Sequence, residues 1–382
     1  MLRLVEIAKV TAGQAAPKIF GNEGYPFIRA GHLEELIEGK SLSDLPKVSQ
    51  EVSKQHRLNL LPKHSIIFAK SGMSATKNRI YILKEEAYFV SHLAAILPNE
   101  NIDMNYLSKF LYWYNPTNLI LDEAYPSIRL EDINNLEIPL PPLPQQQKIA
   151  NILDAVDSLR QNDKALIAKY DELTQALFLD MFGDPVSNPK GWEKLMLGEI
   201  SKISSGSTPS RENESYYVGE IPWVKTGEVN STVIYDTSEK ISEEALTNSS
   251  CKLYPKGSLI IAMYGQGKTR GQIGMLGIDA TTNQACGVIP PSDKMNFNFL
   301  FELLQLNYED LRSLGRGGNQ PNLNSALLKS YEVINPPLEL QNQFAVRVEI
   351  IEEQKAIAQK SLEKSESLFN SLLQRAFKGE IG

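Results

Sequence analysis

Three stretches of this 382-residue chain combine basic side chains with glycine and contain no acidic residue, namely 69–81, 263–274 and 311–323. Lysine and arginine neutralise DNA phosphates, and arginine, asparagine and glutamine can pair with the edges of bases. A single charge on a loop is more often simply solvated, so the prediction rests on the groups. With Ser127 and Arg129 from the stretch 125–129, the residues that we expect to contact DNA are Lys70, Ser71, Lys77, Arg79, Tyr264, Gln266, Lys268, Arg270, Arg316, Asn319 and Gln320.

The composition limits the class of protein. The chain has 39 Lys and Arg against 46 Asp and Glu, a formal net charge of −7. This balance excludes a uniformly basic nucleic-acid binder but not a local basic surface. The two cysteines, Cys251 and Cys286, exclude a disulfide scaffold, and no apolar run approaches the length of a signal peptide core or a membrane span. We therefore expect a cytoplasmic protein.

The sequence contains an internal duplication. LVEIAKVTAG begins at Leu4 and LGEISKISSG at Leu197, and SIIFAKSG begins at Ser65 and SLIIAMYG at Ser258, each pair 193 residues apart. A repeat of this length is too long for a solenoid unit and predicts two copies of a whole domain.

Each copy has two parts. The first part carries short apolar runs broken by Gly, Asn, Ser and Pro, and these runs predict strands. It also contains two predicted helices, Met104–Tyr114 and Phe297–Gln305. The second part, about 145–181 and 340–377, lacks internal Gly and Pro and predicts one long helix. The predicted domains are 1–140, a first long-helix segment 141–185, 186–335, and a second long-helix segment 336–382.

Apolar residues recur every three or four positions along both long helices, as in the seam of a coiled coil. Each helix could pack on its own globular domain, or the two could pair with each other. The duplication favours antiparallel pairing about a pseudo-twofold axis. We therefore predict an α+β fold, with two α/β domains separated by two antiparallel coiled-coil helices. The predicted seam residues are Ile149, Ile152, Val156, Leu159, Leu166, Tyr170, Leu173, Phe344, Val348, Ile351, Leu362, Phe369 and Leu372.

Several motifs resemble the specificity subunit of type I restriction–modification systems. They are GSTPSR at 206–211, GEIPWVKTG at 219–227, PPLPQQQKIA at 141–150 and PPL at 336–338. The resemblance implies two target recognition domains, each recognising one half of a split, asymmetric DNA site, with Thr208, Ser210 and Arg211 among the DNA-binding residues.

The resemblance also implies partners. The long helices would set the gap between the half-sites and dock two modification subunits, which carry S-adenosylmethionine and methylate adenine, while restriction subunits cleave the DNA. The chain itself would be non-catalytic and hold no cofactor. The first domain departs from the motif at 14–18, where QAAPK replaces STPSR, and Phe27 stands in the place of Trp223.

Two other functions stay open. The segment Ala262–Thr269 fits a relaxed phosphate-loop pattern, which would suit a nucleotide-binding enzyme, but the residues that follow predict a strand where such a site needs a helix. The Asn335-Pro336-Pro337-Leu338 segment lacks the aromatic side chain of the adenine methyltransferase motif. The four histidines fit no metal-ligand spacing, so we predict no metal site and no catalytic residue. The second alternative is a coiled-coil adaptor that does not bind DNA.

Overall fold

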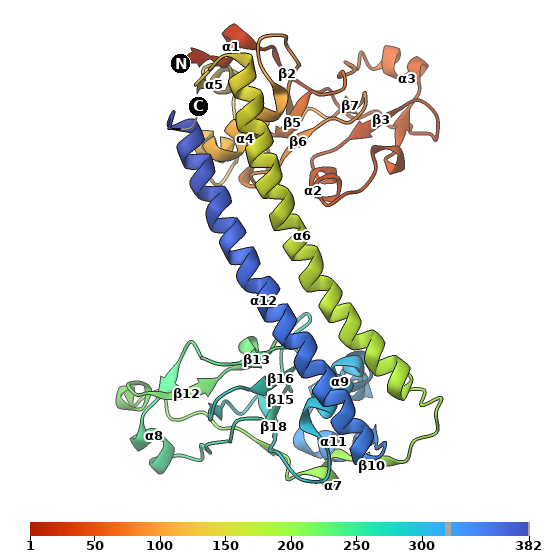
Figure 1. Ribbon diagram of the computed structural model, residues 1–382, viewed down its shortest axis with the longest axis vertical. Helices are drawn as coiled ribbons and strands as arrows, with labels where there is room; N and C mark the ends of the chain where they lie inside the picture. Colours follow the sequence, from red (N-terminus) through yellow and green to blue (C-terminus); the bar gives the residue numbers. More distant parts are fainter. Residues whose placement is uncertain (318–321, 381–382) are drawn as a thin grey trace. The chain divides into compact units, whose positions relative to one another are not determined.

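The computed structural model describes residues 1–317 and 322–380, which form two compact units. Unit 1 comprises residues 1–164 and 360–382, and unit 2 comprises residues 165–359. Each unit mixes helices and sheets, as Figure 1 shows. In the described ranges, no helix is both long enough and apolar enough to cross a bilayer.

Unit 1 is built on an antiparallel sheet in the order β2-β8-β5-β6, beside a sheet in the order β4-β3-β7 and a pair β1-β9. Its strands are β1 (Leu2–Arg3), β2 (Val10–Ala12), β3 (Tyr25–Ile28), β4 (Lys47–Val48), β5 (Ile66–Ala69), β6 (Ile80–Ile82), β7 (Tyr88–Phe89), β8 (Leu93–Ile96) and β9 (Glu137–Ile138). Its helices, besides parts of two long ones, are α1 (Leu4–Ile7), α2 (His32–Ile37), α3 (Gln50–Gln55), α4 (Met104–Tyr114) and α5 (Leu130–Asn134).

Unit 2 repeats this strand order and adds one strand, β13, which pairs parallel to β16 at the edge of the main sheet. Its main sheet has the order β11-β18-β15-β16-β13, with a sheet β14-β12-β17 and a pair β10-β19. Its strands are β10 (Lys194–Met196), β11 (Ser204–Ser205), β12 (Ile221–Val224), β13 (Val233–Ile234), β14 (Lys240–Ile241), β15 (Leu259–Ala262), β16 (Ile273–Leu276), β17 (Thr281–Thr282), β18 (Cys286–Ile289) and β19 (Glu332–Ile334). Its short helices are α7 (Leu197–Ile200), α8 (Glu243–Asn248), α9 (Phe297–Leu306), α10 (Tyr308–Ser313) and α11 (Ser325–Lys329).

The repeat has a physical basis in the central strands. β5 and β15 are buried along their whole length and pair with neighbours on both edges, so nearly continuous apolar runs are required there. The helix that follows each sheet starts at a side-chain cap. Asp103 Oδ1 accepts a hydrogen bond from Tyr106 N at 2.9 Å, and Asn296 caps α9 in the same way. The predicted helices Met104–Tyr114 and Phe297–Gln305 are confirmed as α4 and α9.

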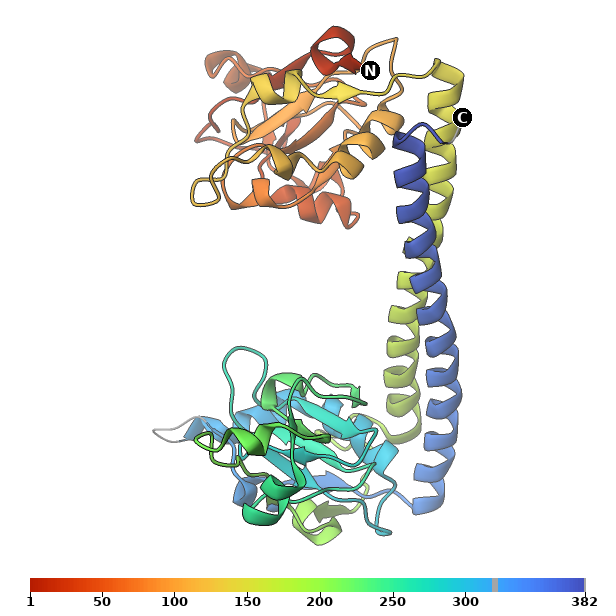
Figure 2. The ribbon, with the colours of Figure 1, turned by 90° about the vertical axis from the view of Figure 1, so that its left-hand side faces the viewer.

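Two 40-residue helices, α6 (Leu143–Phe182) and α12 (Leu338–Phe377), each contribute one part to each unit. Within unit 1, Arg160 lies over the ring of Phe369 at 4.3 Å, and Ser365 Oγ donates to Asp163 Oδ2 at 2.9 Å. Arg160 precedes Asp163 whereas Phe369 follows Ser365, so the two segments run in opposite directions. Both views show them side by side (Figure 1, Figure 2).

The corresponding segments in unit 2 also pack on each other. Lys355 Nζ lies 2.5 Å from Asp171 Oδ1, and the rings of Phe178 and Phe344 meet edge to face with centroids 5.4 Å apart. Here too the contact nearer the start of α12 falls nearer the end of α6, so within unit 2 the segments are antiparallel.

Three leucines of the predicted seam lie outside it. Leu159, Leu166 and Leu173 are 54%, 41% and 49% exposed. One residue later along the helix, Arg160 covers the ring of Phe369 in α12, and Thr174 is buried. Both series have the same spacing, so spacing alone did not identify the inner one. Of the other predicted seam residues, Ile152, Tyr170 and Leu372 are half-buried, and the buried ones are Ile149, Val156, Phe344, Val348, Ile351, Leu362 and Phe369.

A buried glutamine attaches the start of each long helix to the globular part of its unit. Gln146 is 1% exposed; its Oε1 accepts from Asp103 N at 2.9 Å, and its Nε2 donates to Pro141 O at 2.8 Å. In unit 2, Gln341 is fully buried and makes the same bonds to Asn296 N and Pro336 O, at 2.9 and 2.8 Å.

The buried amide of Gln146 gives a first prediction. Gln146→Leu removes both bonds and leaves the Asp103 amide and the Pro141 carbonyl without their partner, so we expect the free energy of unfolding to fall by about 2–3 kcal/mol. The exposed neighbour Gln147 supplies the control, because Gln147→Leu changes the same side chain at the surface. Urea unfolding of both variants measures the difference. Equal midpoints for the two variants would show that these bonds contribute nothing.

Candidate nucleic-acid interface

Two of the stretches singled out in the sequence meet in unit 1. Lys70 O accepts a hydrogen bond from Ile128 N at 2.7 Å, Gly72 N donates to Pro126 O at 2.9 Å, and Ser71 bridges to Ser127. The loop after β5 therefore lies against the segment that leads into α5. Lys70, Ser71, Ser127 and Arg129 come together on one surface, with Ser127 and Arg129 exposed.

A histidine that we had not selected supports this surface. His92 Nδ1 lies 2.7 Å from Ser71 Oγ, and His92 O accepts from Lys70 N at 2.9 Å. In the repeat, Ala285 stands in this place, so the comparison of the two copies gave no signal for it. His92 holds the hydroxyl of Ser71 in one position beside the lysine.

Unit 2 has the same pair of adjacent segments. Leu323 N donates to Met263 O at 3.0 Å, which is the counterpart of the Ile128–Lys70 bond. The loop after β15 thus lies against the chain that leads into α11, and Gln266 and Lys268 are exposed on it.

Side chains from α10 hold this second loop. Tyr308 Oη donates to Lys268 O at 2.6 Å, and Arg312 donates to Tyr308 Oη at 2.6 Å and to Gly267 O. Gly267 has φ +58°, a conformation that suits glycine. Arg312 is thus a positioning residue for the loop: its guanidinium binds the main chain.

The remaining predicted DNA-binding residues differ in their exposure and in their contacts. Lys77 is exposed, whereas Arg79 forms an ion pair with Glu34. Tyr264 is exposed and Arg270 is half-buried. Arg316 lies in the 3-10 turn Leu314–Gly317, and Asn319 and Gln320 lie outside the described residues.

The basic residue of the GSTPSR segment is engaged within its own domain. The Arg211 guanidinium lies over the rings of Tyr217 and Trp223, 4.1 and 5.1 Å from their centroids, and pairs with Glu239 at 2.8 Å. Lys225 binds the same carboxylate at 2.8 Å, and these two hydrogen bonds, first from Lys225 and then from Arg211, lower the pKa of Glu239. Through these contacts, Arg211 connects the GSTPSR segment to Tyr217, Trp223 and Glu239 of the same domain. Nearby, Thr208 donates to Gln284 and Ser210 is exposed.

The phosphate-loop alternative lacks its structural requirement. After the loop that contains Ala262–Thr269, the chain enters β16, which pairs antiparallel with β15 through Ile260 and Gly274. Phosphate loops depend on a helix whose first amides face the phosphates, and a strand presents no such row of amides. The segment Ala262–Thr269 therefore lacks the helix that a phosphate-binding loop of this type requires.

Solved structures share the fold. The S subunit of a type I restriction–modification system from M. genitalium has a TM-score of 0.61 at 16% identity, with 98% of this chain and 95% of that one covered. A second similar structure, described as the basis of complex assembly and conformational transition of the type I R-M system, has a TM-score of 0.60 at 18% identity and covers 99% and 97%.

Sequence comparisons give the same family. The chain is 23% identical to the type I restriction enzyme MjaIX specificity subunit of Methanocaldococcus jannaschii, over 87% of this chain and 81% of that protein. It is 30% identical to the HindI specificity subunit of Haemophilus influenzae, over 50% and 42%. Residues 1–169 and 189–366 match the type I restriction modification DNA specificity domain, and the chain therefore belongs to the family of type I restriction–modification specificity subunits.

Proposed function

We propose that this chain recognises a split, asymmetric DNA site, with one half-site bound by each unit, and that it catalyses no reaction itself. The observation that supports this is the pair of adjacent segments that occurs once in each unit. The backbone bonds that join them are equivalent, but the polar side chains differ: the half-buried Lys70 and the exposed Ser127 in unit 1, and the exposed Gln266 and Lys268 in unit 2. Equal scaffolds with different polar groups suit the recognition of two different short sequences.

The long helices suit a spacer. We infer that α6 and α12 form an antiparallel coiled coil about a pseudo-twofold axis, and that its length sets the number of unrecognised base pairs between the half-sites. The opposite directions of the two segments within each unit support this inference.

The partners follow from the family. Two modification subunits would dock on the helices and on the sides of the recognition domains and supply S-adenosylmethionine and the adenine methyltransferase activity, while restriction subunits would cleave the DNA. With a net charge of −7, the chain itself offers limited phosphate neutralisation. Basic surfaces of the partners would therefore add to DNA affinity. The domain boundaries, the cytoplasmic location and the absence of a cofactor stay predictions.

A methylation map tests this function. In cells that contain the chain and its methyltransferase subunit, single-molecule sequencing should show methyladenine in both halves of a split motif. Replacement of residues 186–335 by the matching domain of another specificity subunit should change one half of that motif and leave the other intact. A change in both halves would contradict separate recognition by the two units, and the absence of any motif would favour the DNA-free adaptor.

The repeat offers matched lysines for a binding experiment. Lys70 and Lys268 lie in the proposed DNA-contacting loops, whereas Lys63 and Lys256 are exposed at equivalent positions before β5 and β15. With the methyltransferase subunit present, Lys70→Ala and Lys268→Ala should each weaken DNA binding about three- to tenfold and reduce the slope of log K against log salt by about 1. Fluorescence anisotropy measures both quantities. Losses of the same size in Lys63→Ala and Lys256→Ala would mean that the loops are not the contact surface.

A further inference from the structure

Each unit has a groove between its recognition helix and its long-helix segments. In unit 1 the groove lies beside α4, β6 and α6, with a volume of about 390 Å³; in unit 2 it lies beside α9, β13, β16, α6 and α12, with a volume of about 810 Å³. Gln146 and Gln341 make equivalent hydrogen bonds, so each long helix begins at the same point relative to α4 or α9. Residues at equivalent sequence positions therefore line the two grooves. The residues that line one groove can therefore be compared directly with those that line the other.

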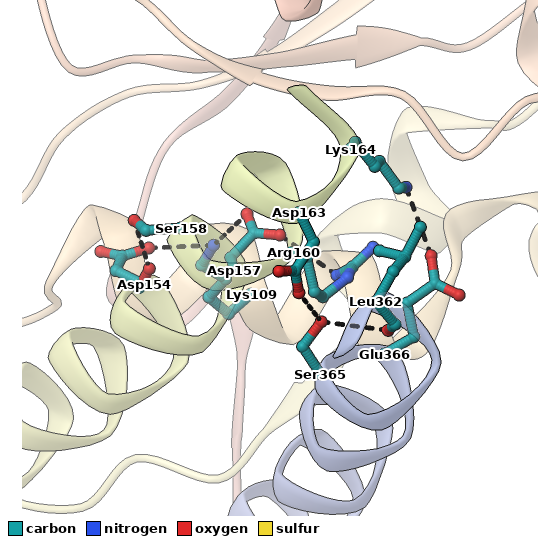
Figure 3. A network of polar contacts seen from close by, with 10 residues as sticks. All are labelled: Lys109, Asp154, Asp157, Ser158, Arg160, Asp163, Lys164, Leu362, Ser365 and Glu366. Carbon is teal, nitrogen blue, oxygen red and sulfur yellow. Dashed lines mark hydrogen bonds and ion pairs between the residues drawn. The ribbon is translucent and has the colours of Figure 1, made fainter. Parts of the chain in front are cut away.

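Two cationic and two acidic side chains line the groove of unit 1, and Figure 3 shows these four among neighbouring polar residues. Lys109 Nζ, from α4, lies 2.9 Å from Asp154 Oδ1 and 3.5 Å from Asp157 Oδ2. Arg160 pairs with Asp157 at 3.1 Å and covers the ring of Phe369. Two cations thus face two carboxylates, and the ammonium of Lys109 occupies the space between α4 and α6.

The groove of unit 2 keeps the carboxylates but lacks the central cation. Glu349 and Glu352 stand where unit 1 has Asp154 and Asp157, and Lys355 stands where it has Arg160, but Glu302 replaces Lys109. With Asp171, four carboxylates line this groove against the single ammonium of Lys355. That ammonium is already paired, at 2.5 Å with Asp171 and 3.5 Å with Glu352.

Glu302 is left in an unfavourable position. Among the described residues, no hydrogen bond or ion pair reaches its carboxylate. Burial, and then the charge of Glu352, raise the pKa of Glu302 to about 7, against a small opposing effect of Lys355. Glu302 is half-buried, and a partly desolvated carboxylate beside like charges is destabilising unless a cation neutralises it.

We propose that the groove of unit 2 receives a lysine or arginine side chain of a partner protein, which occupies the place that Lys109 holds in unit 1. The cation would bind between Glu302, Glu349 and Glu352. This inference rests on the proposed function, because the partner is the methyltransferase subunit. The acidic lining disfavours a DNA phosphate, and the equivalent groove shows that an ammonium on a protein side chain fits these positions.

The variant Glu302→Lys tests the inference, because it gives unit 2 the residue that unit 1 already has. The new ammonium should fill the groove, raise the thermal unfolding midpoint of the free chain and weaken binding of the methyltransferase subunit about tenfold or more. Isothermal titration of the purified full-length chain with that subunit measures the affinity. Glu332→Lys, at an exposed position of β19 away from the groove, introduces the same charge change and should bind like the wild type.

The outcomes separate two failures. If the wild-type chain binds no methyltransferase subunit, the proposed function and this inference both fail. If the wild type and Glu302→Lys bind equally well, only the groove inference fails. Should Glu302→Lys not fold, Glu302→Gln provides the comparison: it removes one carboxylate and should weaken binding, and unchanged affinity in this variant would also overturn the inference.

Glu302→Gln also has an expected pH dependence in the free chain. Between pH 4.5 and about 7, the folded wild type keeps the Glu302 proton that the unfolded chain releases, so its stability falls relative to the variant as the pH rises. The difference in urea midpoint should be smallest near pH 4.5 and reach its full size above about pH 7, with Glu302→Gln the more stable protein. The charges that face Glu302 from the other elements are Asp171, Glu349, Glu352 and Lys355. A difference in urea midpoint that does not change with pH would show that the pKa of Glu302 in the folded chain is the ordinary value of a carboxyl group.

Discussion

The rest of each unit depends on one buried side-chain amide. Gln146 and Gln341 each bind the main-chain amide of the residue that caps α4 or α9 and a carbonyl of the proline segment before the long helix. Because both ends of the amide are satisfied away from water, the long helix has a single register on α4 or α9. That register brings Asp154 and Asp157 beside Lys109 two to three turns later.

In both units, main-chain hydrogen bonds hold the loops, whereas the exposed side chains of the loops differ between the units. The loop after β5 and the loop after β15 are joined to their neighbouring segments by main-chain bonds, from Ile128 to Lys70 and from Leu323 to Met263. Main-chain bonds do not depend on the identity of the exposed side chains. A recognition domain built in this way can exchange lysine, serine, glutamine or tyrosine at its surface without loss of the fold, as a family of DNA specificity subunits requires.

The sequence predicted what local patterns and the repeat can encode. The duplication, the helices Met104–Tyr114 and Phe297–Gln305, and the strand after the phosphate-like loop all appear in the structure. The inner face of α6 could not be predicted from spacing, because the Leu159 series and the series one residue later have the same period. The partners of Arg211 were also missed, since Tyr217, Trp223 and Glu239 converge on it only through the tertiary fold. Nor could the sequence indicate that 70–72 lies against 126–128, because main-chain bonds leave no side-chain signal.

The position shared by Lys109 and Glu302 shows how a duplicated scaffold can become asymmetric. The carboxylates that surround this position are present in both units. A change of charge there costs stability in the isolated chain, because Glu302 faces Glu352 and Lys355 is already paired with Asp171. Two identical partner subunits would meet a groove with paired charges on unit 1 and a predominantly acidic groove on unit 2. The same partner surface would then meet different charges on the two units, although the main sheets share the strand order β2-β8-β5-β6 and β11-β18-β15-β16.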